Sequence, residues 1–257
     1  MISDSDSRIL KRMGYLADQE GIIRRYLREQ GGWDSHLLKC RKYITDRVKA
    51  QAISDITILG SGWLLDVPLE ELAELCNSVS LIDINHPRQI RRKVKQFKNV
   101  RLLKDDITGG LINEVWKICR GEPGNLNSID LPPYRFDSDP GTLISLNILT
   151  QTDTLLIDYL TKNTKINIEE QRRFRERVQS SHINLLKPYP HLLITDFEEE
   201  IIDIDTGTII EIRPLLFTSM PEGKNIQEWE WIFDSSGEYY RRKRVSFKVM
   251  ALDNFER

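Results

Sequence analysis

Between residues 54 and 200, short apolar runs alternate with stretches whose apolar residues recur at helical spacing. The apolar runs predict strands at 55–59, 78–84, 99–107, 141–149 and 190–200. The intervening stretches predict helices at 68–76, 86–97, 111–118 and 168–187. Strands and helices that alternate in this way are typical of a parallel sheet with helices on both faces.

The N-terminal part of the chain has a different pattern. Residues 8–53 show helical spacing that is interrupted at Gly31 and Gly32. This pattern predicts an N-terminal helical cap over residues 1–53. We expect the cap to form a single globular unit with an α/β domain over residues 54–257, because 257 residues with 40% hydrophobic content fit one domain with a helical appendage.

The pattern changes again after residue 200. Two isoleucine-rich arms flank residues 205–207 and predict a hairpin over 201–212. Two further strands are predicted at 226–234 and 244–252. The segment between these strands is too short for a helical crossover, so the two strands must pair antiparallel. The predicted sheet is therefore mostly parallel and ends in an antiparallel C-terminal hairpin.

Composition narrows the function classes. Lys plus Arg number 37 and Asp plus Glu number 39, so net charge gives no reason to expect nucleic acid or an anionic membrane as the main partner. Basic runs such as 88–96 would form a nucleic-acid surface only if they gathered on one face. The chain has neither a leader-like N-terminus nor an apolar run near the roughly 18 residues of a membrane span. We expect a cytoplasmic protein and no membrane partner.

The three cysteines, Cys40, Cys76 and Cys119, lie far apart and have no spacing typical of metal ligands. They are typical of reduced thiols in a cytoplasm, and no metal site is expected. The oligomeric state is not determined by the sequence.

A glycine turn follows the first predicted strand, in the segment ITILGSGWLLDVP. Gly60, Ser61 and Gly62 connect the strand to a helix, an arrangement that often binds a nucleotide-like ligand. A dinucleotide site needs a third glycine, and Leu64 and Leu65 stand where it would be. The missing glycine makes a dinucleotide ligand less favoured without excluding it. The alternative is that both glycines only make a tight turn.

Acidic residues follow the second and third predicted strands. Asp83 lies where a carboxylate can accept hydrogen bonds from both hydroxyls of a ribose. Asp106 lies where a carboxylate can bind an adenine amino group beside the apolar Ile107. The alternatives are that Asp83 is a solvated or capping acid, that Asp105 points inward instead, or that Asp106 caps the turn before Thr108.

These features together resemble the class I S-adenosylmethionine-dependent methyltransferases, over residues 54–252. The resemblance implies a Rossmann-like α/β fold whose seven-stranded sheet has six parallel strands and one antiparallel strand. It also implies S-adenosylmethionine as the cofactor, bound by residues at the glycine turn and at three strand ends. These residues are Gly60, Ser61, Gly62, Asp83, Ile84, Asp106, Ile107 and Asn147.

The chain departs from this family at two positions. Ile58 stands where the family often has an acid, and Leu64 stands where it often has a third glycine. The segments GSGWLLDVPLEEL, IDINHPR, DDITG and SLNILTQ together resemble a bacterial branch of methyltransferase-like proteins of unassigned substrate.

Several polar residues are candidates for the chemistry. Asn147, followed by Gln151, is either a catalytic residue that orients a nucleophile or a buried amide that holds its loop. His182 is either a general base or a core histidine. His36 is either part of a lid or an exposed helix residue, and Asp66 is near enough to the turn to favour a sulfonium.

The sequence thus predicts methyl transfer from S-adenosylmethionine to a small-molecule acceptor. Acceptor selectivity is expected from the loop 119–140 and from the hairpin 201–212. Two alternatives remain open: an NAD-dependent oxidoreductase, and a non-enzymatic binding protein on the same fold.

Overall fold

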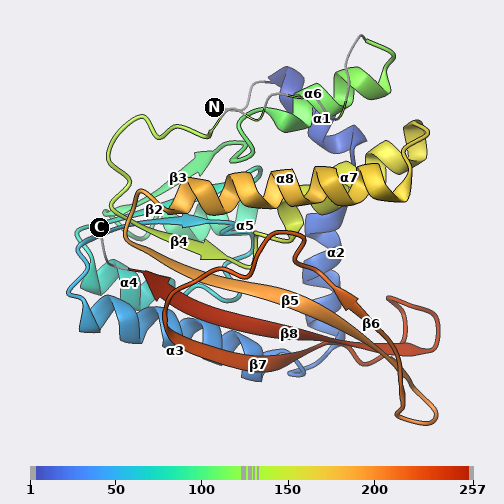
Figure 1. Cartoon of the computed structure of the whole chain (residues 1–257). Coiled ribbons are helices and arrows are strands. Elements are labelled where there is room, and N and C mark those ends of the chain that lie inside the picture. Colours follow the sequence, from blue (N-terminus) through green and yellow to red (C-terminus); the bar gives the residue numbers. More distant parts are fainter. Residues whose placement is uncertain (1–3, 123–125, 127–128, 130, 132, 255–257) are drawn as a thin grey trace.

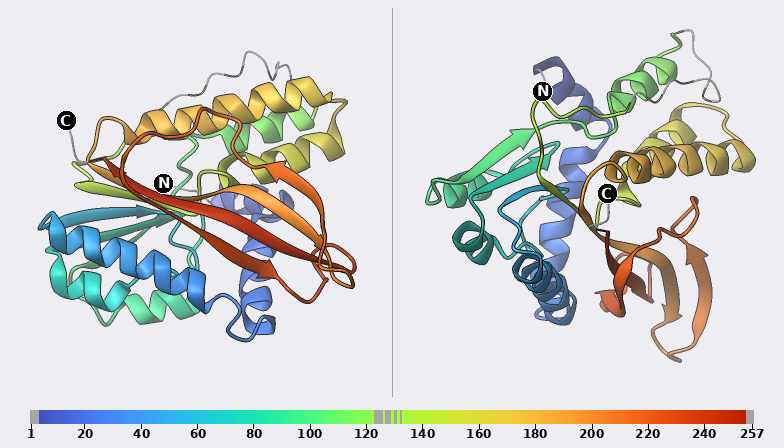
Figure 2. Two further views of the ribbon diagram at one scale, coloured as in Figure 1. Left: turned by 60° about the horizontal axis from the view of Figure 1, so that its bottom comes forward. Right: turned by 60° about the vertical axis from the view of Figure 1, so that its left-hand side comes forward.

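The computed structural model describes residues 4–122, 126, 129, 131 and 133–254, and its strands form one twisted sheet (Figures 1 and 2). The strand order is β3-β2-β1-β4-β5-β8-β7, and β6 pairs with β5 outside this path. The strands are β1 Asp55–Leu59, β2 Ser78–Asp83, β3 Val100–Lys104, β4 Thr142–Leu146, β5 His191–Asp203, β6 Ile209–Pro214, β7 Lys224–Asp234 and β8 Lys243–Asn254.

The first five strands run parallel to one another. In the middle of the sheet, Ile58 of β1 pairs with Leu81 of β2 and Ile144 of β4. All three side chains are buried, because helices cover both faces of this part of the sheet. The last strand, β8, inserts antiparallel between β5 and β7. Six strands of the seven-stranded path therefore point one way and one points the other, which confirms the predicted Rossmann-like sheet.

The helices form a layer on each face of the sheet and a cap across one edge (Figures 1 and 2). Helices α3, α4 and α5 share a buried cluster with β1, β2 and β7, and α8 packs against the opposite face. Helix α2 crosses the edge where the parallel strands end. The helices are α1 Asp4–Arg12, α2 Tyr15–Arg28, α3 Asp34–Ala50, α4 Leu69–Leu75, α5 Arg88–Val94, α6 Leu111–Cys119, α7 Gln151–Asn163 and α8 Ile168–Leu186.

The sequence missed one helix. Only α8 was predicted between β4 and β5, whereas α7 precedes it and packs against it. The buried Leu156, Ile157 and Leu160 of α7 do have helical spacing, but Thr, Asp and Asn residues among them weaken the pattern. A capping box at the start of α8, in which Asn167 and Glu170 bond to each other's backbone, marks the boundary between the two helices.

Strand β5 is longer than predicted. Its last residues form the first arm of the predicted hairpin, and β6 forms the second arm. Residues 198–203 of β5 extend beyond β4, so β6 pairs with them where β4 has already ended. The predicted loop 119–140 falls partly outside the described residues, and its last part, 133–140, contains neither helix nor strand.

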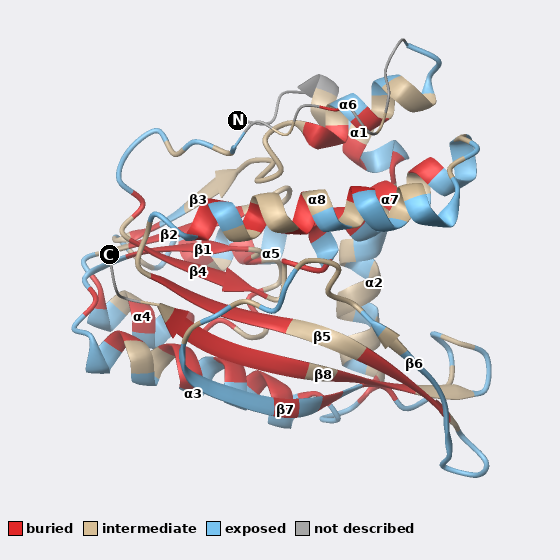
Figure 3. Cartoon of the chain, viewed as in Figure 1, coloured by how far each residue is buried: buried red, intermediate tan, exposed pale blue. Residues whose placement is uncertain are grey.

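Burial varies from strand to strand across the sheet. Figure 3 shows β5 and β8 mostly buried, whereas β7 alternates between exposed and buried positions near its end. None of the helices in the described part of the chain combines the length and apolar character needed to cross a membrane.

Candidate functional site

A cavity of about 580 Å³ opens at the edge of the sheet where the parallel strands end. In open α/β sheets this edge is the usual place for a ligand. Its walls come from the strand ends, from α2 and α7, and from β7 and β8. All eight residues predicted to bind the cofactor line it: Gly60, Ser61, Gly62, Asp83, Ile84, Asp106, Ile107 and Asn147.

The glycine turn is held against two strand ends. A Cβ atom on Gly60 would lie 2.7 Å from the Cβ atom of Ile148 and 2.9 Å from the carbonyl oxygen of Leu146. Gly60 therefore allows a close approach that another residue would block. The backbone N–H of Gly62 donates to Oδ2 of Asp83 at 2.8 Å. Between the two glycines, the hydroxyl of Ser61 is buried and has no hydrogen-bond partner in the described part of the chain.

The carboxylate of Asp83 keeps capacity for a ligand. Its Oδ1 atom lies 3.5 Å from the amide nitrogen of Gln19 and 3.3 Å from the backbone nitrogen of Asn85, which are long hydrogen bonds. Burial raises the pKa of Asp83 above its ordinary value. Gln19 and Asn85 also exchange hydrogen bonds at 2.7 and 2.9 Å, so α2 is fastened to the end of β2.

At the end of β3, both acidic residues line the cavity and each already has a local partner. Oδ1 of Asp106 accepts hydrogen bonds from the backbone and hydroxyl of Thr108 at 2.9 and 2.6 Å. This carboxylate does cap the turn before Thr108, as one alternative held. The hydroxyl of Tyr134 donates to Oδ2 of Asp105 at 2.9 Å. An adenine contact by Asp106 stays a prediction.

Asn147 lies at the end of β4 in the left-handed backbone region, with φ of 48°. Its Nδ2 atom donates to Oδ2 of Asp66 at 2.7 Å, and its own carbonyl oxygen accepts from Gln151 at 2.6 Å. Burial raises the pKa of Asp66 to about 6. The side-chain Oδ1 of Asn147 is buried without a hydrogen-bond partner among the described residues, although this residue lines the cavity.

His36 is 1% exposed, so the prediction of an exposed helix residue was wrong. The indole N–H of Trp229 donates to its Nδ1 atom at 3.1 Å, and Trp231 stacks on its ring with centroids 4.0 Å apart. An indole N–H can only donate, so Nδ1 holds the lone pair and the proton of the neutral ring lies on Nε2. Burial lowers the pKa of His36 to about 3, which keeps the ring neutral.

This tautomer argues against a metal ion near His36. Donor atoms of His36, Cys40 and Asp66 lie within 4.8 Å of one another. A histidine binds a metal through an unprotonated nitrogen, whereas Nδ1 is taken by Trp229 and Nε2 carries the proton. The donor set therefore does not fit a metal ion.

The remaining histidines lie elsewhere. His182 does not line the cavity. Its Nε2 atom lies 2.8 Å from the hydroxyl of Ser145, and burial lowers its pKa to about 4. These contacts are those of a histidine in the core, and a catalytic role for His182 stays a prediction. His86 directly precedes the N-cap of α5 and bonds to the carbonyl oxygen of Leu103 at 3.0 Å.

The far wall of the cavity was not predicted from the sequence. It comes from α2, from β7 and β8, and from the segment that joins these two strands. It carries aromatic and basic side chains, namely Arg25, Trp231, Phe233, Tyr239, Tyr240 and Phe247. Helical spacing predicted α2, but it did not indicate which face of the helix would pack against β7 and β8, about two hundred residues later in the chain.

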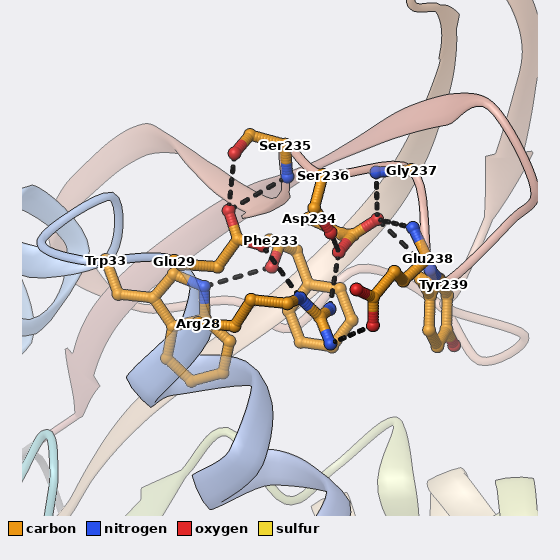
Figure 4. A network of polar contacts seen from close by, with 10 residues as sticks. All are labelled: Arg28, Glu29, Trp33, Phe233, Asp234, Ser235, Ser236, Gly237, Glu238 and Tyr239. Carbon is orange, nitrogen blue, oxygen red and sulfur yellow. Dashed lines mark hydrogen bonds and ion pairs between the residues drawn. The ribbon is translucent and has the colours of Figure 1, made fainter.

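A polar network fixes this wall in place (Figure 4). Arg28 of α2 donates to the buried Asp234 at 2.8 Å and to Glu238 at 2.7 Å. Asp234 also accepts backbone N–H bonds from residues 237–239 at 3.0 to 3.1 Å. Oε2 of Glu29 accepts from the backbone and hydroxyl of Ser235 at 2.9 and 2.6 Å. The end of α2 is therefore bound to the segment after β7.

Comparison with known proteins finds likeness among solved structures only. No protein-family model matches the sequence, and no curated protein matches it. Among solved structures, the chain is similar to the crystal structure of the 23S rRNA methyltransferase ErmE. The two share 13% sequence identity, with a TM-score of 0.26, over 84% of this chain and 69% of that chain. The fold assignment rests on the order and direction of the strands.

Proposed function

We propose that the protein is an S-adenosylmethionine-dependent methyltransferase that acts on a small molecule. One observation carries the proposal: a single cavity is lined by the glycine turn, Asp83, Asp106 and Asn147, at the carboxyl ends of β1 to β4. S-adenosylmethionine consists of a nucleoside attached to an amino acid. Such a ligand needs hydrogen-bond donors and acceptors at several points along the sheet edge, and these strand ends provide them.

The residues present fit this cofactor. Asp83 has only long hydrogen bonds at Oδ1 and could accept from a ribose. The space beside Gly62 is open toward Asp83. A Cβ atom added to Gly62 would have Oδ2 of Asp83 as its nearest neighbour, at 4.0 Å. The unpartnered oxygens of Ser61 and Asn147 belong to residues that line the same cavity. Buried polar atoms of this kind are usually satisfied by a ligand or by water.

S-adenosylmethionine would supply an electrophilic methyl group, which a lone pair of the acceptor would take while the carbon–sulfur electron pair stays on sulfur. The residues of the chain orient the two reactants and exclude water. Asp66, held by Asn147, is suited to take the acceptor's proton, because its pKa of about 6 leaves it ionised but basic near neutral pH.

The charge of the cavity supports a small acceptor. Its walls carry eight carboxyl side chains and three arginines. A cationic sulfonium is favoured in such surroundings, whereas the phosphates of a nucleic acid would be repelled. An acceptor that enters the cavity is therefore proposed to be a small molecule.

Calorimetry tests the proposal. We expect S-adenosylmethionine and S-adenosylhomocysteine to bind the wild type, and Asp83→Ala to weaken both by about 10- to 100-fold, the usual loss for a hydrogen bond to a charged group. Asp46→Ala is the control, because Asp46 is an exposed acid that pairs with Lys42 on α3. Tight binding of NAD without a response to either sulfur ligand would favour an oxidoreductase. Binding of none of the three would favour a non-enzymatic protein.

A further inference from the structure

Arg25 of α2 lines the cavity on the wall away from the glycine turn. In the described part of the chain, the contacts of its guanidinium are with two ring faces. The guanidinium carbon lies 4.3 Å from the ring centroid of Phe233 and 4.6 Å from that of Tyr239. Its Nε atom is buried without a hydrogen-bond partner among these residues. A partly buried guanidinium with no carboxylate partner has the features of a site for an anion.

The other two arginines of the cavity are already paired. Arg175 forms an ion pair with the fully buried Asp153. Arg213 forms one with Glu211 at 2.7 Å and also reaches Glu199 at 3.5 Å. Arg25 therefore differs from its neighbours in having its charge uncompensated at contact distance. Burial lowers the pKa of Arg25 from its ordinary value, although Asp234 and Asp18 act against this shift from a distance.

Two carboxylates, Asp234 and Asp18, act on the charge of Arg25, but neither forms an ion pair with it in the described part of the chain. Asp234 follows Phe233 directly, but its two oxygens accept from Arg28, Ser236 and three backbone N–H groups. This network also fixes Tyr239, whose own N–H donates to Asp234 at 3.1 Å (Figure 4). The rings of Phe233 and Tyr239 meet edge to face with centroids 5.2 Å apart, and the guanidinium of Arg25 packs in the corner between them, about one helical turn before Arg28.

We propose that Arg25 binds an anionic oxygen group, a carboxylate or a phosphate, carried by the methyl acceptor. This inference rests on the proposed function, because it treats the opposite end of the cavity as the cofactor end. The planar fork of a guanidinium matches two oxygens of such a group, and the contacts with Phe233 and Tyr239 restrict the fork before binding. One open arginine suits one anionic group and not a polyanion.

The test compares ligands of one shape and different charge. Benzoate, phenyl phosphate and the neutral benzyl alcohol are titrated into the wild type, Arg25→Met and Arg24→Met, with and without S-adenosylhomocysteine. Arg24 is the control, since it is the exposed neighbour of Arg25 on the same helix. We expect benzoate or phenyl phosphate to bind the wild type at least about tenfold more tightly than benzyl alcohol. This preference should disappear in Arg25→Met and persist in Arg24→Met. Whichever anion binds more tightly identifies the group as carboxylate or phosphate.

A second arm separates the acceptor from the cofactor, which has a carboxylate of its own. S-adenosylhomocysteine and 5′-methylthioadenosine, which lacks the amino-acid part, are titrated into the same variants. Equal affinities of wild type and Arg25→Met for S-adenosylhomocysteine support the acceptor assignment. A loss of S-adenosylhomocysteine binding without a loss of methylthioadenosine binding would overturn it, because the anion would then belong to the cofactor.

Two further results would also overturn the inference: benzyl alcohol binding as tightly as the anions, or Arg25→Met binding the anions like the wild type. Arg25→Lys keeps the charge without the fork and should retain part of the preference, which guards against a folding defect in Arg25→Met. If the proposed function is wrong, the titrations give a different result. In that case neither adenosine ligand binds the wild type, while the titrations without cofactor still report on Arg25.

Discussion

Gly60 packs directly against the residues at the end of β4. They occupy the space that a side chain at position 60 would need. Its φ is 84°, and an added Cβ atom would meet Ile148 and the backbone of Leu146. The turn can therefore keep its position only while residue 60 has no side chain. Gly60 is therefore required by the fold itself, in addition to being part of the ligand site.

We expect Gly60→Ala to lower the free energy of unfolding by about 2–4 kcal/mol, the sum of a left-handed alanine and an overpacked contact. Gly121→Ala is a matched control, because Gly121 has the same φ of 84° and nothing within 4 Å of an added Cβ. Its cost should be about 1 kcal/mol. Urea denaturation measures both. Equal costs for the two variants would show that the contact with Ile148 is unimportant.

Asp66 makes stability depend on pH. Its pKa is raised to about 6 by burial, so the folded state holds the proton more tightly than the unfolded state does. Its contribution is favourable below about pH 4 and is lost as the pH rises through 6. We expect Asp66→Asn to be more stable than the wild type at pH 8, by roughly 1–3 kcal/mol, and similar to it at pH 4.

Chemical denaturation across this pH range tests the prediction, with Asp46→Asn as an exposed control. A difference between wild type and Asp66→Asn that stays constant with pH would contradict it.

At the residue scale, the sequence predicted the side chains that follow parallel strands. Asp83 and Asn147 could be placed because the ends of parallel strands meet at one edge of a sheet. Gln19 and Arg25 could not be placed, since they reach the cavity from a helix outside the alternating pattern. The burial of His36 depends on Trp229, a residue 193 positions later in the chain.

At the scale of elements, one buried carboxylate connects α2 to the segment between β7 and β8. Asp234 is fully buried and accepts from Arg28 and from three successive backbone N–H groups. Burial alone would raise its pKa, but these hydrogen bonds outweigh burial and the pKa is lowered. Its contribution to stability is therefore present at neutral pH and is lost as the pH falls below about 4.

We expect Asp234→Ala to cost about 3 kcal/mol of unfolding free energy at pH 7, because it breaks a buried ion pair and leaves backbone donors unpaired. Asp205→Ala removes an exposed partner of Arg242 and should cost at most about 1 kcal/mol. Denaturation at pH 7 and pH 3 measures both. A cost for Asp234→Ala no larger than that for Asp205→Ala would refute this role.

Two elements differ from the prediction, each for its own physical reason. Helix α7 was overlooked because its polar residues blur the helical spacing, although its buried leucines carry the pattern. The hairpin at 201–212 was predicted from its turn, but its first arm is part of β5. Turn residues locate a reversal of the chain, whereas the length of a strand depends on neighbours that are distant in sequence.

On the scale of the whole molecule, the cavity is bounded by both ends of the chain. Its walls include Tyr15 near the N-terminus and Phe247 near the C-terminus. A ligand that fills the cavity contacts elements that lie far apart in sequence, so its binding should stabilise the fold as a unit.

We expect S-adenosylhomocysteine at 100 times its dissociation constant to raise the unfolding free energy by about 2.7 kcal/mol. Thermal unfolding at increasing ligand concentration measures this effect. Asp83→Ala at the same ligand concentration should show a smaller rise. A rise that is equal in both proteins would place the ligand away from Asp83.

The place of β8 in the sheet has a consequence for synthesis on the ribosome. β8 is the last of the described strands to be translated, yet it lies between β5 and β7 and is the strand with which β7 pairs. Strand β7 therefore emerges from the ribosome before the strand with which it pairs. Until β8 has followed it out, β7 is an unpaired strand that bears Trp229 and Trp231, and unpaired edges of this kind make incompletely folded chains prone to aggregation.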